Sequence, residues 1–188
     1  MRKFSLSNKD NDPLNLSRLF IIVSSALIVI GWFALILTLA GIFYKAILIP
    51  IIILTFAGVG FFIARYKGFK KPSKTDLFAL ALVLLLAISS IVYFHDTFFG
   101  GRDDGLYANH AIYLALNHDL IVDEYHDISY IPPALVKVNA DYTTSRYPGY
   151  IAWTALHCAF GGTSGIRFSN FLLIIIALMS LYLIGKKL

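Results

Sequence analysis

The hydrophobic positions of this chain are gathered into long runs that polar residues hardly interrupt. Such runs cover residues 19–44, 46–64 and 76–94, and two further runs follow at 149–160 and 167–184. A helix needs about 20 apolar residues to cross the hydrocarbon core of a bilayer. The pattern therefore predicts an all-α, polytopic membrane bundle of about five spans, in which the fourth span is short.

The polar segments between these runs divide the chain into three parts. Residues 1–18 are polar and show no periodicity, which indicates a short tail. Residues 19–75 form a tight helix hairpin followed by a basic loop. Residues 76–188 contain the third helix, a long loop over residues 95–147 and the last two helices. A loop of that length is expected to carry structure of its own.

Composition agrees with a membrane protein, and the charges predict its orientation. The chain is 58% hydrophobic and 14% charged, whereas about a quarter of the residues are charged in soluble domains. Basic residues precede the first apolar run and separate the second from the third, while the loop over residues 95–147 holds eight of the eleven acidic residues. Under the positive-inside rule the N-terminus is cytoplasmic and this loop is external. The net charge of +5 thus reflects topology, and no nucleic-acid partner is expected.

The last two lysines do not fit this topology. Five spans place Lys186 and Lys187 outside, against the positive-inside tendency. Either the chain is incomplete at its C-terminus, or one of the last two helices is not a full span; we favour the first explanation. The single cysteine, Cys158, and the compact loops favour a prokaryotic plasma membrane.

The external loop carries the main candidate chemistry. Asp103 and Asp104 follow two glycines and open a helix whose apolar positions recur at helical spacing, at Leu106, Tyr107, His110, Ala111 and Leu114. An aromatic, amphipathic helix that is too short to span belongs in the plane of the membrane interface. A carboxylate held there can act as a general base, or can hold a divalent cation such as Mg²⁺ or Mn²⁺ beside a phosphate leaving group. Capping the helix is the alternative role for either aspartate.

Two other polar groups lie in the same loop. Asp123, Glu124, His126 and Asp127 form an acidic cluster, but their spacing matches no calcium-loop signature, so a solvated surface is the better interpretation. Arg146, where the loop returns to the membrane, suits a bidentate contact with a lipid phosphate or an ordinary interfacial anchor. The sequence contains no glycine-rich phosphate loop after a strand, no Cys-x-x-Cys pair and no nucleophile elbow.

From about Ile91 to Leu188 the chain resembles the N-terminal part of the GT-C type polytopic glycosyltransferases. Within that class it is most similar to the dolichyl-phosphate-mannose protein mannosyltransferase and aminoarabinose-transferase-like superfamily. The matching pieces, in chain order, are Asp103–Tyr107 with Ala111–Ala115 in the loop helix, Arg146–Tyr150 at the return to the membrane, and Ile166–Phe168 leading to Tyr182–Lys186. The order and spacing of these pieces are more specific than any single one.

The resemblance implies transfer of a sugar from a polyprenyl-phosphate donor to an acceptor on the external face, with inversion at the anomeric carbon. It implies that Asp103 is the base or acceptor-orienting acid, that Asp104 is its partner, and that the substrate contacts are Arg102, Tyr107, Arg146 and Tyr147. In this family Asp104 is often glutamate and Arg146 is often lysine. Members also have many more helices, which further sequence or a partner chain would supply. The alternative is a non-enzymatic membrane module, such as a small transporter subunit or an assembly partner.

Overall fold

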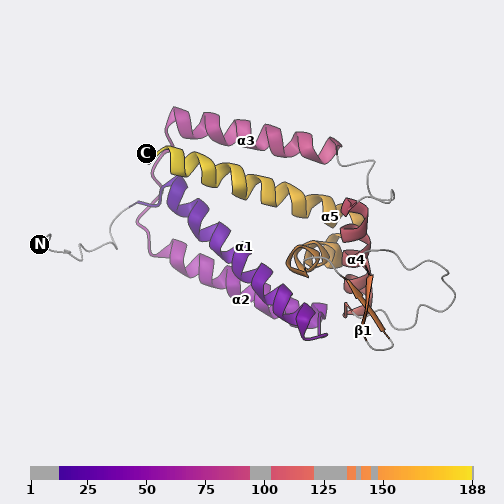
Figure 1. Ribbon diagram of the computed structural model, residues 1–188. Coiled ribbons are helices and arrows are strands. Elements are labelled where there is room, and N and C mark those ends of the chain that lie inside the picture. The colour runs from indigo at the N-terminus through magenta and orange to yellow at the C-terminus, as the bar shows by residue number, and fades with distance from the viewer. Residues whose placement is uncertain (1–12, 94–102, 121–134, 139–140, 145–147, 188) are drawn as a thin grey trace, which may run out of the picture.

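Long helices run side by side in this protein, and shorter elements lie across one of their ends (Figure 1). The computed structural model describes residues 13–93, 103–120, 135–138, 141–144 and 148–187, with the backbone alone described over 90–93, 103–106 and the two short strands. The long helices are α1 (Leu16–Leu39), α2 (Lys45–Ala64), α3 (Lys74–Tyr93) and α5 (Pro148–Gly185). The short elements are α4 (Asp103–Asn117) and an antiparallel hairpin of β1 (Leu135–Val138) and β2 (Asp141–Thr144). The mainly helical prediction is confirmed, whereas the hairpin was not predicted.

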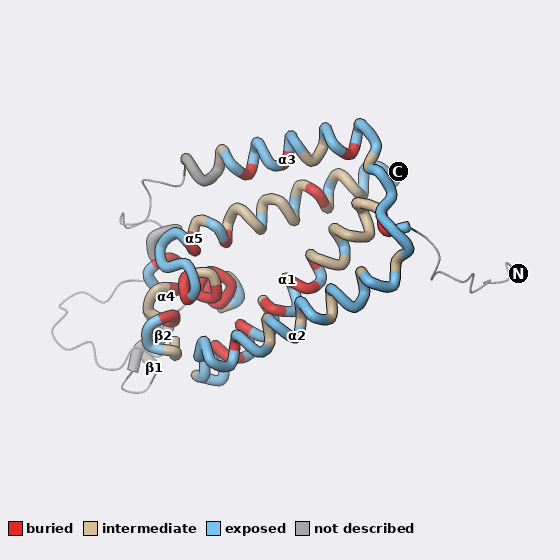
Figure 2. Tube along the Cα trace, turned by 180° about the vertical axis from the view of Figure 1, so that it is seen from behind, coloured by how far each residue is buried: buried red, intermediate tan, exposed pale blue. Residues whose placement is uncertain are grey.

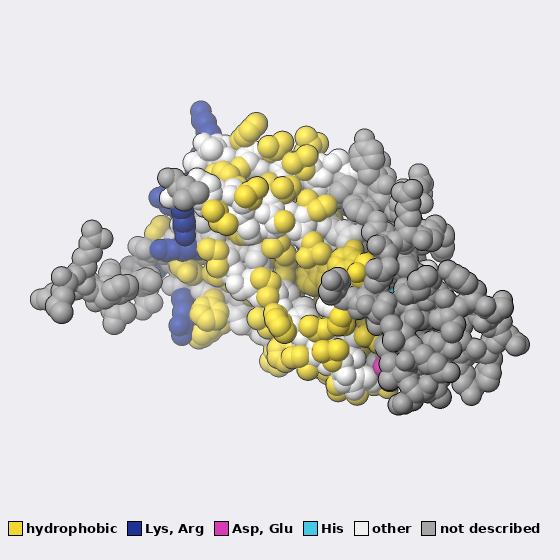
Figure 3. Space-filling view, viewed as in Figure 1, with side chains coloured by type: hydrophobic (Ala, Val, Ile, Leu, Met, Phe, Trp, Pro, Cys, Tyr) yellow, Lys and Arg dark blue, Asp and Glu magenta, His cyan; other side chains and the backbone are white. Residues whose placement is uncertain are grey.

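Three of the helices, α1, α2 and α5, are long and apolar enough to cross a membrane, among the residues whose side chains are described. Their outward surfaces are apolar, as Figure 3 shows over the middle of the molecule. Leu54 on α2 is 71% exposed and Leu85 on α3 is 64% exposed. Large apolar side chains left bare in this way are stable in lipid and unstable in water. The protein is therefore a helical, membrane-associated protein.

The hairpin of α1 and α2 turns within a few residues, as the sequence indicated. Asn15 caps α1, because its side-chain oxygen accepts a hydrogen bond from the backbone N–H of Arg18 at 2.8 Å. α1 ends at Leu39 rather than at the expected Tyr44, and Gly41 takes a positive φ of 66° to turn the chain. α2 then begins at Lys45 and runs back beside α1 (Figure 1).

α5 differs from the arrangement predicted for the last two helices. Residues 149–160 and 167–184 were expected to be separate spans joined by a turn. The structure has two helical halves within α5 that meet at the non-helical residue Gly162, so the break was predicted, but the direction of the first half was not. Gly162 has φ 59° and ψ −145°, a conformation open essentially to glycine alone. The first half of α5 is seen end-on in Figures 1 and 2, whereas the second half runs beside α1 and α3. The first half therefore lies across the long helices rather than alongside them.

This kink places the C-terminus at the same end of the molecule as the basic loop. Figure 3 shows several of the described lysine and arginine side chains gathered at that end, whereas Lys45 at the start of α2 lies at the α4 end. Lys186, one residue beyond α5, forms an ion pair with Asp76 in the first turn of α3. The prediction that Lys186 and Lys187 lie at the end opposite the basic loop is wrong. The rejected explanation, that one of the last two helices does not cross, agrees with the structure.

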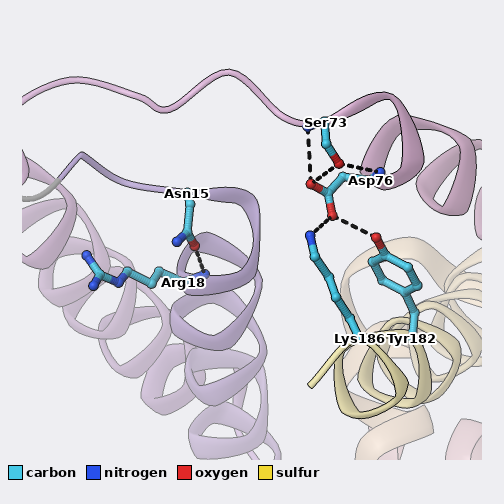
Figure 4. Close-up of polar contacts among 6 residues, drawn as sticks. All are labelled: Asn15, Arg18, Ser73, Asp76, Tyr182 and Lys186. Carbon is cyan, nitrogen blue, oxygen red and sulfur yellow. Dashed lines mark hydrogen bonds and ion pairs between the residues drawn. The ribbon is translucent and has the colours of Figure 1, made fainter. Parts of the chain in front are cut away.

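Asp76 joins α3 to α5 through several hydrogen bonds (Figure 4). One carboxylate oxygen accepts from Lys186 Nζ at 2.5 Å and from the Tyr182 hydroxyl at 2.7 Å, while the other accepts from the Ser73 hydroxyl at 2.7 Å and the Ser73 backbone N–H at 3.1 Å. The Ser73 hydroxyl in turn accepts from the Asp76 backbone N–H at 3.1 Å, which completes a capping box. The Lys186 ammonium and these hydroxyl donors hold the pKa of Asp76 well below its usual value of 3.8. Asp76, in the first turn of α3 at the basic end of the molecule, is thus ionised and fully partnered.

Replacing Asp76 with alanine is expected to lower the free energy of unfolding by about 1–3 kcal/mol, because the carboxylate that accepts hydrogen bonds from Ser73, Tyr182 and Lys186 is lost. Because the pKa of Asp76 is lower in the folded protein than in the unfolded chain, its stabilisation is complete above about pH 5 and declines as the pH falls below 3.8. Thermal unfolding in detergent, followed by circular dichroism, should show a constant difference from wild type near neutrality that narrows in acid. Thr75→Ala on the exposed neighbouring residue is the control. A difference that does not change with pH would contradict the assignment.

Candidate functional site at the junction of α4 and α5

α4 lies across the end of the long helices that is opposite the loop between α2 and α3, and it packs on the first half of α5 (Figures 1 and 2). It begins at Asp103, as the sequence predicted for this interfacial helix. Its inner face is formed by Ala111 and Leu114, both fully buried, and by Ala108, while Asn109 points outward. A helix is therefore present where the sequence predicted one, and Ala111 and Leu114 of its predicted apolar face are buried against protein.

The first half of α5 provides a closely packed surface for α4. Ile151, Ala152 and Ala155 are fully buried there. Trp153 reaches the opposite side and packs on α1, where a Cβ added at Gly31 would lie 3.2 Å from the indole ring. This half of α5 is thus buried between α4 and α1, which explains why a short apolar segment can lie across the bundle.

Two aromatic rings connect α4 to the start of α5. The Tyr107 ring, one turn into α4, meets the Tyr150 ring edge-to-face with 5.1 Å between centroids. The Tyr150 hydroxyl donates a 2.7 Å hydrogen bond to the side-chain oxygen of Asn170 in the second half of α5. Trp153 Nε1 likewise donates to the backbone oxygen of Ser169 at 3.2 Å. These contacts fix the beginning of α4 against both halves of the kinked helix.

The other end of α4 is held by the turn between α1 and α2. The Phe43 N–H donates to the backbone oxygen of His118 at 3.1 Å, and His118 Nδ1 lies 3.0 Å from the Phe43 carbonyl oxygen, to which it donates. The His118 ring also packs on Tyr44 with 4.4 Å between centroids. α4 is therefore anchored at both ends, and the hairpin turn lies at the same end of the bundle as α4.

The predicted site residues lie at or beside this junction. Asp103 and Asp104 are the first two residues of α4, and their side chains are outside the described residues. Arg102, Arg146 and Tyr147 are also outside the described residues, as is the acidic cluster of residues 123–127. Tyr107 is the predicted contact whose side chain is described. It lies against Tyr150, which follows Tyr147 by three residues and Arg146 by four in the sequence.

An apolar groove at the α5 kink was not predicted from the sequence. It has a volume of about 620 Å³ and lies between α1, α2 and the two halves of α5. His157 lines it with its Nδ1 2.9 Å from the Trp153 carbonyl oxygen, and its ring is tilted against the Trp153 indole with 4.4 Å between centroids. Phe56 and Phe168 cover other walls, so the groove suits a hydrocarbon chain. The sequence features at this place are His157 and the five small residues 161–165, and these residues predicted a turn but not a groove.

No metal site is apparent in the part of the chain whose side chains are described, where no three histidine, cysteine or acidic residues cluster. The fold and the junction together define a helical membrane protein with a laterally packed helix at one end. Comparisons with protein-family models, with curated proteins and with solved structures found no match for this chain.

Proposed function

We propose that this chain is the N-terminal part of a membrane glycosyltransferase that uses a polyprenyl-phosphate sugar donor at the α4 end of the bundle. The observation that carries the proposal is the contact between Tyr107 and Tyr150. It holds the helix that starts with Asp103 and Asp104 against the helix that directly follows Arg146 and Tyr147. In this proposal the contact brings the two acidic residues and Arg146, which are far apart in sequence, to the same end of the bundle.

The surroundings of this end of the bundle suit a lipid-linked donor. α4 lies across the helix ends, as expected of an interfacial helix, and most of the described basic residues are at the opposite end (Figure 3). With the positive-inside rule, the α4 end is on the external face of a prokaryotic plasma membrane. The groove at the α5 kink offers an apolar surface for part of the isoprenoid chain. The donor phosphate would then meet Arg146, whose planar guanidinium can make two parallel hydrogen bonds to it.

The transfer step needs a proton acceptor and a stabilised leaving group. In the proposed step an acceptor hydroxyl attacks the anomeric carbon, its proton passes to the Asp103 carboxylate, and the bond from carbon to the phosphate oxygen breaks. The polyprenyl phosphate leaves with the bonding electron pair, and Arg146 stabilises its charge. Arg102, Tyr107 and Tyr147 would orient the sugar and headgroup. Adjacent carboxylates at Asp103 and Asp104 also suit Mg²⁺ or Mn²⁺, which would neutralise the same charge.

Donor binding tests the proposal independently of the acceptor. The native protein, purified from its own membrane in whatever length it has there, is titrated with tritiated polyprenyl-phosphate mannose. Binding that Arg146→Gln weakens by about ten-fold or more would support the proposal, since a charge-assisted contact to phosphate is lost. Lys67→Gln at the basic end is the matched control and should bind normally. Absence of binding, or equal binding by Arg146→Gln, would favour the non-enzymatic membrane module.

We also propose that α1, α2, α3 and the second half of α5 cross the bilayer, and cysteine labelling tests this topology of four crossings. In a Cys158→Ala background, single cysteines replace Lys67, Asn109 or Lys187, all of which are exposed. In intact cells a membrane-impermeant maleimide should label position 109 and spare positions 67 and 187. The five-span topology instead predicts that position 187 is labelled together with position 109.

A further inference from the structure

A second pocket, of about 820 Å³, lies at the basic end of the bundle, remote from α4 (Figure 3). The start of α1, the loop between α2 and α3, and the end of α5 enclose it. Its cationic lining residues are Arg18, Lys70, Lys71, Lys186 and Lys187. Among the described lining residues Asp76 is the one carboxylate, and its charge is already matched by Lys186. The pocket therefore has a strong excess of positive charge.

Apolar side chains line the same pocket between the charged ones. Phe20 and Ile21 come from α1, and Leu183 and Ile184 come from the last turn of α5. A small soluble anion would bind the cations and leave this apolar surface uncovered. A molecule that carries both a phosphate and hydrocarbon chains would cover both.

The walls of the pocket are joined to one another by hydrogen bonds. The Leu14 N–H donates to the Gly68 carbonyl at 3.0 Å, and the Lys70 N–H donates to the Leu14 carbonyl at 2.8 Å. These bonds hold the segment before α1 against the loop between α2 and α3, and Leu14 is buried. On the other side Asp76 joins the start of α3 to Lys186 (Figure 4). A site whose walls are already in place loses little entropy on binding.

We infer that this pocket binds one anionic phospholipid from the leaflet at the basic end. Lys70 and Lys71 contact the phosphate, and the acyl chains cover Ile21 and Leu183. The position agrees with this occupant, because anionic lipids of the cytoplasmic leaflet attract basic residues at the ends of membrane helices. The site lies at the opposite end of the bundle from the proposed donor site and faces the other leaflet.

Native mass spectrometry of the delipidated full chain in detergent tests the inference, because detergent removes the general surface charge of a membrane. Dioleoylphosphatidylglycerol should bind as a single copy and clearly more tightly than dioleoylphosphatidylcholine. The double variant Lys70→Gln, Lys71→Gln should bind it at least about ten-fold more weakly. Both lysines are exposed, so circular dichroism of the variant should match that of the wild type.

The double variant Lys67→Gln, Lys74→Gln is the matched control. It removes the same charge from the same end of the molecule, but neither lysine lines the pocket. Phosphatidylglycerol affinity should stay within about two-fold of wild type, since short-range contacts are kept. Equal losses in both double variants, or equal affinity for phosphatidylcholine, would overturn the inference.

A chain-free competitor separates a lipid site from a general anion site. Glycerophosphoglycerol, the deacylated form of phosphatidylglycerol, has the same phosphodiester charge without acyl chains and should fail to displace bound phosphatidylglycerol at equal concentration. Displacement at that concentration would mean that the apolar lining adds nothing and would refute a phospholipid site.

Discussion

The variant Asp103→Asn is expected to lose sugar transfer by at least about a hundred-fold while keeping its fold, because a general base contributes roughly 10² to 10⁴ to the rate. Asparagine has the size of aspartate and caps helices about as well, so the change removes the charge and the proton acceptor without removing a cap. α4 begins at Asp103, where a negative charge near the helix N-terminus is worth about 0.3–1 kcal/mol. A purely structural role would therefore cost little stability and no activity.

The measurement is transfer of tritiated mannose from polyprenyl-phosphate mannose by the purified native protein, with unfolding recorded on the same samples. Asp119→Asn is the matched control, since it makes the same chemical change beyond the other end of α4. Near-normal transfer by Asp103→Asn would remove Asp103 from the mechanism. Full loss in both variants would show that charge in this region is needed for some other reason.

The variant Gly165→Ala is expected to disrupt the kink of α5 and to lower the free energy of unfolding by about 3 kcal/mol, the upper range for overpacking. A Cβ at position 165 would overlap the carbonyl group of His157, which belongs to the main chain and cannot rotate away. Relief requires that the two halves of α5 separate. That movement would pull Tyr150 from Asn170 and the first half of α5 from α4.

Two neighbouring glycines provide graded controls for this prediction. Gly161→Ala adds a Cβ into open space without a positive φ, so it should be close to neutral. Gly162→Ala also meets no atoms, but its φ of +59° should cost about 1–3 kcal/mol. Unfolding in detergent, followed by circular dichroism, should show Gly161→Ala as the most stable of the three variants, Gly162→Ala next and Gly165→Ala as the least stable. A Gly165→Ala protein as stable as Gly161→Ala would contradict the kinked structure of α5.

Much of the local structure was predictable because its signals lie within a few residues. The Gly-Gly-Arg step before Asp103 indicated a new helix, and the spacing of Ala111 and Leu114 indicated its buried face. The capping box of Ser73 and Asp76 also has a recognisable pattern, although its long-range bonds to Tyr182 and Lys186 do not. A contact between residues that are more than 100 positions apart leaves no pattern in the local sequence.

The kink shows where local signals become ambiguous. Residues 161–165, with three glycines, suit a turn between two antiparallel spans and a bend between two crossed helix halves equally well. Both need a positive φ at a residue such as Gly162. Which of the two arrangements forms depends on whether residues 149–160 are more stable in contact with lipid or packed against α4. Ile151 and Ala155, which are fully buried, show the latter.

By itself the sequence determined that this is a helical membrane protein, where α2, α3 and α4 lie along the chain, and which segments are basic or acidic. These properties follow from apolar run length, helical period and charge, which act over a few turns. Only the tertiary structure decided that the first half of α5 lies across the bundle and that Lys186 meets Asp76. The physical reason is that the angle between the two halves of α5 is set by contacts and not by local sequence. These contacts are the close approach of Gly165 to the His157 carbonyl group and the packing of the Tyr107 ring on the Tyr150 ring.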